Sequence, residues 1–243
     1  MKNYLSSSSI VALCLCTILT RSSFAQGTSP ETGIGAKVST LGVGVEAGMS
    51  VTRHSNVRVG FNVYNHSKTF HSRGITFDGD LDLRSLQITY DQYVIGGLHV
   101  SPSLLAYNGS HIDASAGVPP GQSFSLGGIR YFSGAANPIA GTGTMHVRTV
   151  APAVFLGIGN IVPRSPRRVG FNVEGGIVFQ GSPTTKLNLA GTACVVNPTT
   201  GCLNAGTDPT VQANVQNEQA KLNKDLDPLK YYPVLSVGIS WKF

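Results

Sequence analysis

A base and a nucleophile stand two positions apart at His99 and Ser101, within GGLHVSPSL. A serine hydroxyl attacks when a base takes its proton and a carboxylate orients that base. Residues i and i+2 share one face of a strand, and Glu46 is the carboxylate that we expect on that side. The chain has six histidines and many serines, so a chance pairing is the simpler explanation. We therefore treat the pair as a candidate catalytic site in a protein that we do not expect to be an enzyme.

Four charged residues, Glu46, Arg58, Arg168 and Glu174, alternate with glycine and apolar residues. In a closed barrel these side chains would converge on the interior, which in an eight-stranded barrel is just wide enough for side chains. Buried charges persist when they are paired. We therefore expect a lumen ion-pair network; a selectivity or binding site is the alternative.

Cys194 and Cys202 bracket the short segment CVVNPTTGC. In an exported protein two such cysteines indicate a disulfide, which would contribute ~2–3 kcal/mol by closing that loop. A metal pair would need further ligands nearby, and the remaining histidines are dispersed. We expect no metal and no cofactor. The net charge of +6 is spread thinly, which argues against a nucleic-acid partner.

Residues 1–25 have the features of a cleaved secretory signal peptide, with Lys2 before an apolar run and Ala25 at the cleavage site. The run is too short for a membrane-spanning helix, which needs ~20 residues. Cleavage would also remove Cys14 and Cys16. The mature domain would then comprise residues 26–243 and would reach an oxidising compartment.

Strict alternation of apolar and polar residues recurs along the rest of the chain, and only 12% of the chain is charged. In VRVGFNVYN, for example, Val59 and Phe61 share one face and Arg58 and Asn62 the other. This period predicts β-strands. Seven such segments lie at about 34–49, 56–68, 76–90, 94–107, 144–159, 168–181 and 231–243.

Short connections alternate with two long polar ones, 108–143 and 182–230. This layout, with strands long enough to cross a bilayer at a tilt, predicts a transmembrane β-barrel. A soluble sandwich or lipocalin-like barrel is the rival, with the apolar face turned inward. Glycines and long ionic side chains on the polar faces favour lipid outside. On the apolar face we expect Leu41, Phe61, Phe171 and Trp241 to meet acyl chains.

Such barrels have an even number of strands. We therefore expect eight strands, one more than the seven alternating segments, and the position of the eighth strand is open. The candidates are residues 122–132 and 184–196. The second long connection also predicts a helix over 208–228, with Asp208 as N-cap and Pro209 in its first turn. We expect this helix to cap or enter the extracellular mouth; lying flat on the outside is the alternative.

The C-terminal segment YYPVLSVGISWKF resembles the last strand of Gram-negative outer-membrane proteins. That class carries a polar-x-Gly-x-x-hydrophobic-x-hydrophobic insertion signal, usually ending in an aromatic residue. Its positions are filled here by Ser236, Gly238, Trp241 and Phe243. The resemblance implies insertion by the barrel-assembly machinery.

The wider chain resembles small barrels of the OmpA, OmpX, OmpW and opacity-protein kind, through VRVGFNVYN, APAVFLGIGN and VEGGIVFQGSP. The fold expected is all-β: a transmembrane antiparallel up-and-down barrel of eight strands, with long extracellular loops and one short loop helix. We expect a monomer in contact with outer-membrane lipid and lipopolysaccharide, with a structural or surface-interaction role. A narrow channel for small or apolar solutes is one alternative. A lipid-acting hydrolase, as in some barrel lipid A deacylases, is the other, although their motif around the His–Ser pair is missing here.

Overall fold

The computed structural model describes residues 30–72, 75–107, 110–163 and 167–243. The signal peptide predicted at residues 1–25 lies outside these ranges. Glu31–Phe243 form one unit. None of the helices in the described ranges is long and apolar enough to cross a membrane.

Eight antiparallel strands close into a ring, because the first strand pairs with the last as well as with the second. Closure pairs the backbone of both end strands and leaves no sheet edge in the ring. The all-β antiparallel barrel predicted from the alternation is thus confirmed. In pairing order the ring strands are β1 (Thr32–Ser39), β2 (Gly42–Thr52), β3 (Ser55–Ser72), β4 (Ile75–Ile95), β5 (Leu98–Tyr107), β10 (Val150–Gly159), β11 (Val169–Phe179) and β15 (Tyr231–Lys242).

The eighth strand lies inside the first predicted segment, 34–49, which is a hairpin of β1 and β2. Only Thr40 and Leu41 separate the two strands, and Gly42 turns the chain with a φ of +109°. So short a turn leaves no polar loop in the sequence to separate the two strands, although it shifts the alternation by one position. Residues 122–132 and 184–196, the predicted candidates, lie outside the ring.

The apolar faces point outward from the ring. Phe61, Phe171 and Trp241 are 44%, 68% and 47% exposed, while the alternate residues on the same strands are mostly buried. This is the orientation expected for lipid outside and not for a soluble barrel with an apolar core. Leu41 is the exception: it is 4% exposed, because the turn that contains it directs its side chain into the ring.

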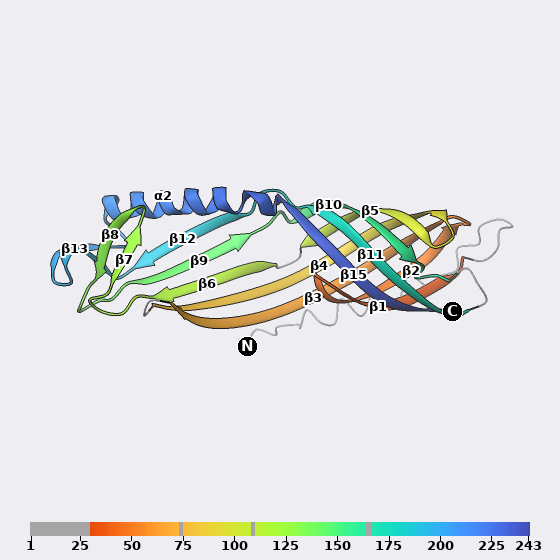
Figure 1. Ribbon diagram of the computed structural model, residues 1–243, viewed down its shortest axis with the longest axis horizontal. Coiled ribbons are helices and arrows are strands. Elements are labelled where there is room, and N and C mark those ends of the chain that lie inside the picture. Colours follow the sequence, from red (N-terminus) through yellow and green to blue (C-terminus); the bar gives the residue numbers. More distant parts are fainter. Residues whose placement is uncertain (1–29, 73–74, 108–109, 164–166) are drawn as a thin grey trace, which may run out of the picture. The chain divides into compact units, whose positions relative to one another are not determined.

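Beyond the ring, β3 and β4 continue as a long hairpin, and β4 there pairs with β6 (His111–Gly117). The strands β9 (Ala140–His146) and β12 (Thr184–Ala190) follow in order. A separate sheet contains β7 (Ser123–Leu126), β8 (Ile129–Ser133), β13 (Thr192–Asn197) and β14 (Thr200–Asn204). We call all the structure beyond the ring the extension (Figure 1). The two long connections therefore contain short strands as well as the helix. β7–β8 and β12–β13 fall on the candidate strand segments 122–132 and 184–196, whereas β6 and β14 have no counterpart among the predicted segments.

The predicted helix is α2 (Pro209–Asp225), followed by the 3-10 turn η2 (Asp227–Lys230). Asp208 caps it as predicted, its side chain accepting hydrogen bonds from the backbone N–H groups of Thr210 and Val211. The helix lies along the strands of the extension rather than in the mouth of the ring (Figure 1). The expectation that it enters or caps the ring is therefore wrong.

The helix protects the edge of the extension sheet at β12. The side-chain oxygen of Asn223 accepts from the backbone N–H of Thr185 at 2.8 Å, and that of Gln219 accepts from Leu187 at 3.1 Å. Unpaired edge N–H groups invite pairing with other chains. The helix thus supplies the acceptors that a neighbouring strand would otherwise provide.

Replacing Asn223 with alanine should expose the edge of β12, because the Thr185 N–H then loses its partner. We expect a local cost of about 1–3 kcal/mol. Faster amide hydrogen exchange at Thr185, with unchanged exchange in the ring and at Leu187, whose N–H keeps Gln219 as its acceptor, would show it. Asn217→Ala on the exposed side of α2 is the matched control. Equal exchange in the two variants would contradict this role of the helix.

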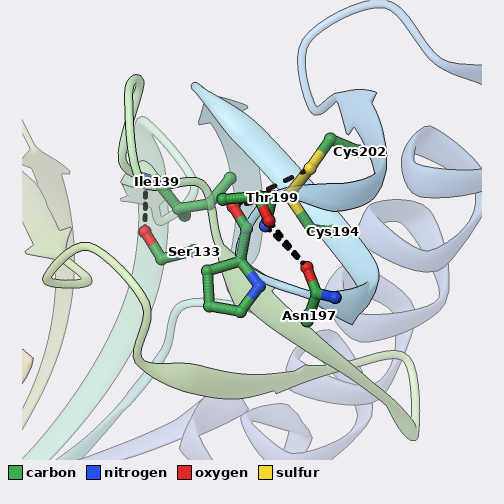
Figure 2. Close-up of a disulfide and its surroundings, with 7 residues drawn as sticks. Ser133, Ile139, Cys194, Asn197, Thr199 and Cys202 are labelled. Carbon is green, nitrogen blue, oxygen red and sulfur yellow. Dashed lines mark hydrogen bonds between the residues drawn. A yellow bond between two sulfur atoms is a disulfide. The ribbon is translucent and has the colours of Figure 1, made fainter.

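The predicted disulfide joins Cys194 of β13 to Cys202 of β14, which are opposed across the hairpin (Figure 2). Cys194 is fully buried, and its neighbour Ala193 belongs to an apolar cluster that includes Tyr131 and Val211. Nearby, Ser133 accepts a hydrogen bond from the N–H of Ile139 (Figure 2). The bridge therefore fixes the tip of the extension and lies away from the ring.

Replacing both cysteines with serine should destabilise the β13–β14 hairpin by about 2–3 kcal/mol, the loop-closure value. Limited proteolysis should then cut between Cys194 and Cys202. The cooperative unfolding of the ring should stay within about 0.5 kcal/mol of the native value, because distant sites behave independently. A large loss of ring stability would contradict the separation of the two parts.

Candidate functional site in the barrel lumen

The centre of the lumen is occupied by Arg58 of β3, which is 3% exposed. Its Nη1 lies 3.3 Å from Glu46 Oε2 and its Nη2 donates to Asp91 Oδ1 at 2.8 Å. The same Nη2 also donates to Glu174 of β11. One guanidinium thus joins carboxylates from β2, β4 and β11. The predicted pairing of Glu46, Arg58 and Glu174 is present, and Asp91 is added to it.

Two more cations complete this cluster. Lys37 Nζ of β1 lies 3.3 Å from Glu46 Oε2 and donates to Gln87 Oε1 at 2.9 Å. His99 places Nε2 3.0 Å from Glu174 Oε1 and Nδ1 3.1 Å from the carbonyl oxygen of Gly97. Both of these partners accept hydrogen bonds, and the ring can satisfy both only as an imidazolium.

We call Lys37, Glu46, Arg58, Asp91, His99 and Glu174 the buried ion-pair network. With His99 protonated, it has three cations and three anions and is neutral as a whole. Charges removed from water are tolerated when they are paired in this way. The network therefore has the features of a structural element that fills the lumen with paired charges.

The candidate catalytic pair is not assembled for nucleophilic attack. Ser101 is buried, and its hydroxyl group donates a hydrogen bond to Asp91 Oδ1 at 2.7 Å. Among the described residues no hydrogen bond joins Ser101 to His99, whose two ring nitrogens face Gly97 and Glu174. The carboxylate on the histidine is Glu174 rather than the predicted Glu46. A serine nucleophile needs its base within hydrogen-bond reach, so the geometry does not support the hydrolase.

Arg168 does not join the network, which corrects the prediction. It is exposed and precedes the first residue of β11, Val169. Its backbone carbonyl accepts from the N–H of Lys242. Because β11 begins at Val169, the strand alternation that turns side chains inward does not include Arg168.

At the end of the lumen where β1 begins and β15 ends, the interior is filled by residues 160–163, which belong to the described part of the turn between β10 and β11. Ile161 and Val162 are fully buried there. A Cβ on Gly33 would lie 2.6 Å from the carbonyl oxygen of Ile161, and one on Gly48 2.9 Å from its Cγ2. The turn therefore occupies space that these glycines leave open.

The other end of the lumen is apolar. The inward residues of β5 change along the strand from His99 and Ser101 to Leu105 and Tyr107. Leu105 and Tyr107 pack with Phe155 and others into a buried layer, and Leu41 completes it. Its members are Leu41, Leu105, Tyr107, Ala151, Ala153, Phe155, Val178 and Val234. We call this set the apolar layer.

Glycines give the large lumen side chains their room. A Cβ on Gly157 would lie 2.6 Å from His99 Nε2 and 2.7 Å from Glu174 Cγ. Gly44 is covered in the same way by the Asn62 side chain, at 2.4 Å. The expectation of a narrow lumen in which glycines stand beside a few large groups agrees with this packing.

One part of the network has ligand types suited to a metal. The side chains of Asp91, His99 and Glu174 can place one ligand atom each within 4.8 Å of one another. Both carboxylates, however, already bind Arg58. The guanidinium supplies the positive charge that an ion would bring.

The residues of the predicted insertion signal alternate across β15. Ser236 is buried and Gly238 packs against the Asn172 side chain inside the ring. Trp241 and Phe243 are exposed on the outer face. The strand itself closes the ring, because it pairs with both β1 and β11.

No protein-family model and no curated protein matches the sequence. Among solved structures, the chain is similar to CarO of Acinetobacter baumannii, with 23% identity over 87% of this chain and 97% of that one, at a TM-score of 0.54. It is also similar to CarO2 of the same organism, with 19% identity over 88% and 98% and a TM-score of 0.56. A major outer membrane protein of Thermus thermophilus has 13% identity over 88% and 100%, with a TM-score of 0.34. The two CarO structures show that the chain shares their fold.

Proposed function

We propose that this chain is an outer-membrane β-barrel with a structural or surface-interaction role: the ring anchors the extension in the membrane. The observation that carries the proposal is the filling of the lumen at three levels. Residues 160–163 of the β10–β11 turn fill one end, the buried ion-pair network fills the middle, and the apolar layer fills the other end. A barrel filled in this way favours an anchor over the alternative of a channel or transporter.

The outer surface of the ring supports the membrane location. A closed barrel satisfies its own backbone hydrogen bonds, which is required in hydrocarbon. Its exposed side chains are largely apolar, as at Val45, Phe171 and Leu235. In barrels of this kind both ends of the chain and the short turns face the periplasm. We therefore orient the extension toward the outside, where lipopolysaccharide is the neighbouring lipid.

Export through the 1–25 signal peptide and recognition of β15 by the barrel-assembly machinery complete the proposal. The inward Ser236 and Gly238 and the outward Trp241 and Phe243 fit the family signal on which it rests. The ring closes within one chain, which agrees with a monomer. The resemblance of this chain to the OmpA, OmpX, OmpW and opacity-protein barrels is part of the same proposal.

Planar-bilayer recording tests the closed lumen. The purified native chain should give no stepwise conductance above that of the detergent alone. Removing large side chains of the apolar layer, as in Leu105→Ala with Phe155→Ala, should allow more leakage than the native chain. Phe171→Ala on the lipid side is the matched control and should not. Regular conductance steps from the native chain would favour the channel instead.

A further inference from the structure

A cavity of about 200 Å³ lies between the apolar layer and the first strands of the extension. Its wall is mainly apolar and comes from distant parts of the chain. The ring contributes Tyr107 and Tyr232, β4 contributes Leu81 and Leu83, and β6 and β9 contribute Ile112 and Met145. None of the buried ion-pair network lines the cavity; His111, whose Nε2 lies 3.4 Å from Asp113 Oδ2, is the one imidazole at the wall.

Most polar groups at the wall already have partners. The Gln180 amide donates to the carbonyl oxygen of Leu229 at 2.8 Å. Ser110 Oγ donates to the carbonyl oxygen of Arg84 at 2.8 Å and accepts from its N–H at 2.9 Å. Tyr232 donates its hydroxyl proton to the Thr40 carbonyl oxygen at 2.8 Å. These groups hold the wall in place.

The Tyr107 hydroxyl differs from them. The residue is 7% exposed, and none of the described residues gives its hydroxyl a hydrogen-bond partner. Buried hydroxyls are normally paired, and leaving one unpaired is unfavourable. Tyr107 lines the cavity, and a small rotation of its side chain would bring the buried hydroxyl to an acceptor bound there.

We propose that this cavity binds a small neutral molecule: a single apolar ring bearing one hydrogen-bond acceptor, such as a carbonyl, for the Tyr107 hydroxyl. The size fits, since an apolar protein cavity of about 150 Å³ holds benzene, whereas drug-sized ligands need roughly 300 Å³ or more. The apolar wall disfavours a charged ligand, which would lose its hydration. The apolar layer closes the ring beneath the cavity, so the bound molecule would lie at the mouth of the ring and would not pass through it. The inference rests on the proposed anchoring role and adds a ligand to it.

The test compares two probes by fluorine NMR, with the protein in lipid nanodiscs and empty nanodiscs as the measure of partitioning into lipid. The probes are 4-fluoroacetophenone, which has the carbonyl, and 4-fluorotoluene, which lacks it. Saturable binding of both above the empty-disc level is expected. Absence of a saturable component would overturn the proposal.

Three variants assign the binding to this cavity. Val147→Phe narrows it and should weaken both probes at least about 10-fold, with Met145→Phe as a second filling variant if the first does not fold. Tyr107→Phe should weaken the ketone about 3- to 10-fold, the range for one hydrogen bond, and leave the toluene within about twofold. Tyr90→Phe, on the lipid side, should change neither. Unchanged binding in the filling variants would place the ligand elsewhere, and an unchanged ketone affinity in Tyr107→Phe would overturn the acceptor requirement.

Discussion

Replacing Arg58 with methionine should lower the free energy of unfolding by about 3–5 kcal/mol at neutral pH, the cost of removing one partner from a buried ion pair. Arg58 joins three carboxylates, and its loss leaves Asp91 without its ion-pair partner. Since folded domains are stable by only about 5–15 kcal/mol, much of the protein should fail to fold. Urea unfolding, followed by the fluorescence of Trp241, the chain's single tryptophan, measures the effect.

Two further variants separate burial from charge. Arg84→Met removes an exposed arginine that pairs with Asp82 at 3.0 Å, and it should cost less than about 1 kcal/mol. Neutralising Asp91 together with Arg58, by Asp91→Asn, should recover part of the loss, because Glu46 keeps Lys37 and Glu174 keeps His99 as partners and no unpaired buried anion remains. Equal costs for Arg58→Met and Arg84→Met would show that the buried network does not stabilise the folded ring.

The second large effect is expected for Gly157→Ala. The new Cβ would stand 2.6 Å from His99 Nε2 and 2.7 Å from Glu174 Cγ, so the side chains that carry the His99–Glu174 contact must move. Overpacking alone costs about 1–3 kcal/mol, and disturbing a buried ion pair adds to that. The same urea titration of Trp241 fluorescence measures the loss.

Gly79→Ala is the control, because a Cβ there would meet nothing nearer than 3.8 Å. It should change stability by less than about 1 kcal/mol, within the range of strand propensities. The double variant Gly157→Ala with His99→Ala should lose less than the sum of the single losses, since removing the imidazole relieves the overlap. Strictly additive losses would contradict the packing described for Gly157.

The orientation of the ring strands was predictable because period-2 alternation is a local property. Phe61 and Phe171 are outward, and Arg58 and Glu174 are inward, as their positions in the alternating segments indicated. The same rule also places Asp91 inward, three residues after the outward Ile88. The alternation therefore marks Asp91 as a member of the network, and this is the acid that the predicted set lacks.

The β1–β2 hairpin was missed for a physical reason. Its two-residue turn shifts the alternation by one position, so that Ile34 and Val38 are outward on β1 and Val43 and Val45 are outward on β2. Continuing the pattern of β2 backward through Leu41 would have placed Lys37 in lipid. A lysine on the apolar face was thus the sign of a turn, and it would have revealed both the eighth strand and the second cation.

Only part of the extension was predictable from the sequence pattern: β7, β8, β12 and β13 fall on the candidate segments 122–132 and 184–196, whereas β6 and β14 do not. Strands such as β6 and β9 are short and consist mainly of small residues. They form strands because β6 pairs with the part of β4 that extends beyond the ring, and β9 pairs with β6. Pairing partners far apart in the chain leave little local trace. The placement of α2 has the same origin, since its position depends on the edge of β12. The partners of His99 likewise come from another strand and from a turn.

Fluorescence quenching of Trp241 tests the central claim, that acyl chains surround the apolar outer face of a ring filled with charged and apolar side chains. The protein would be refolded into vesicles of lipids brominated near the headgroup end of their acyl chains and, separately, into unbrominated vesicles. We predict strong quenching by the brominated chains and weak quenching by aqueous acrylamide, because Trp241 is on the outer face of β15. Strong acrylamide quenching with no effect of bromine would contradict the account.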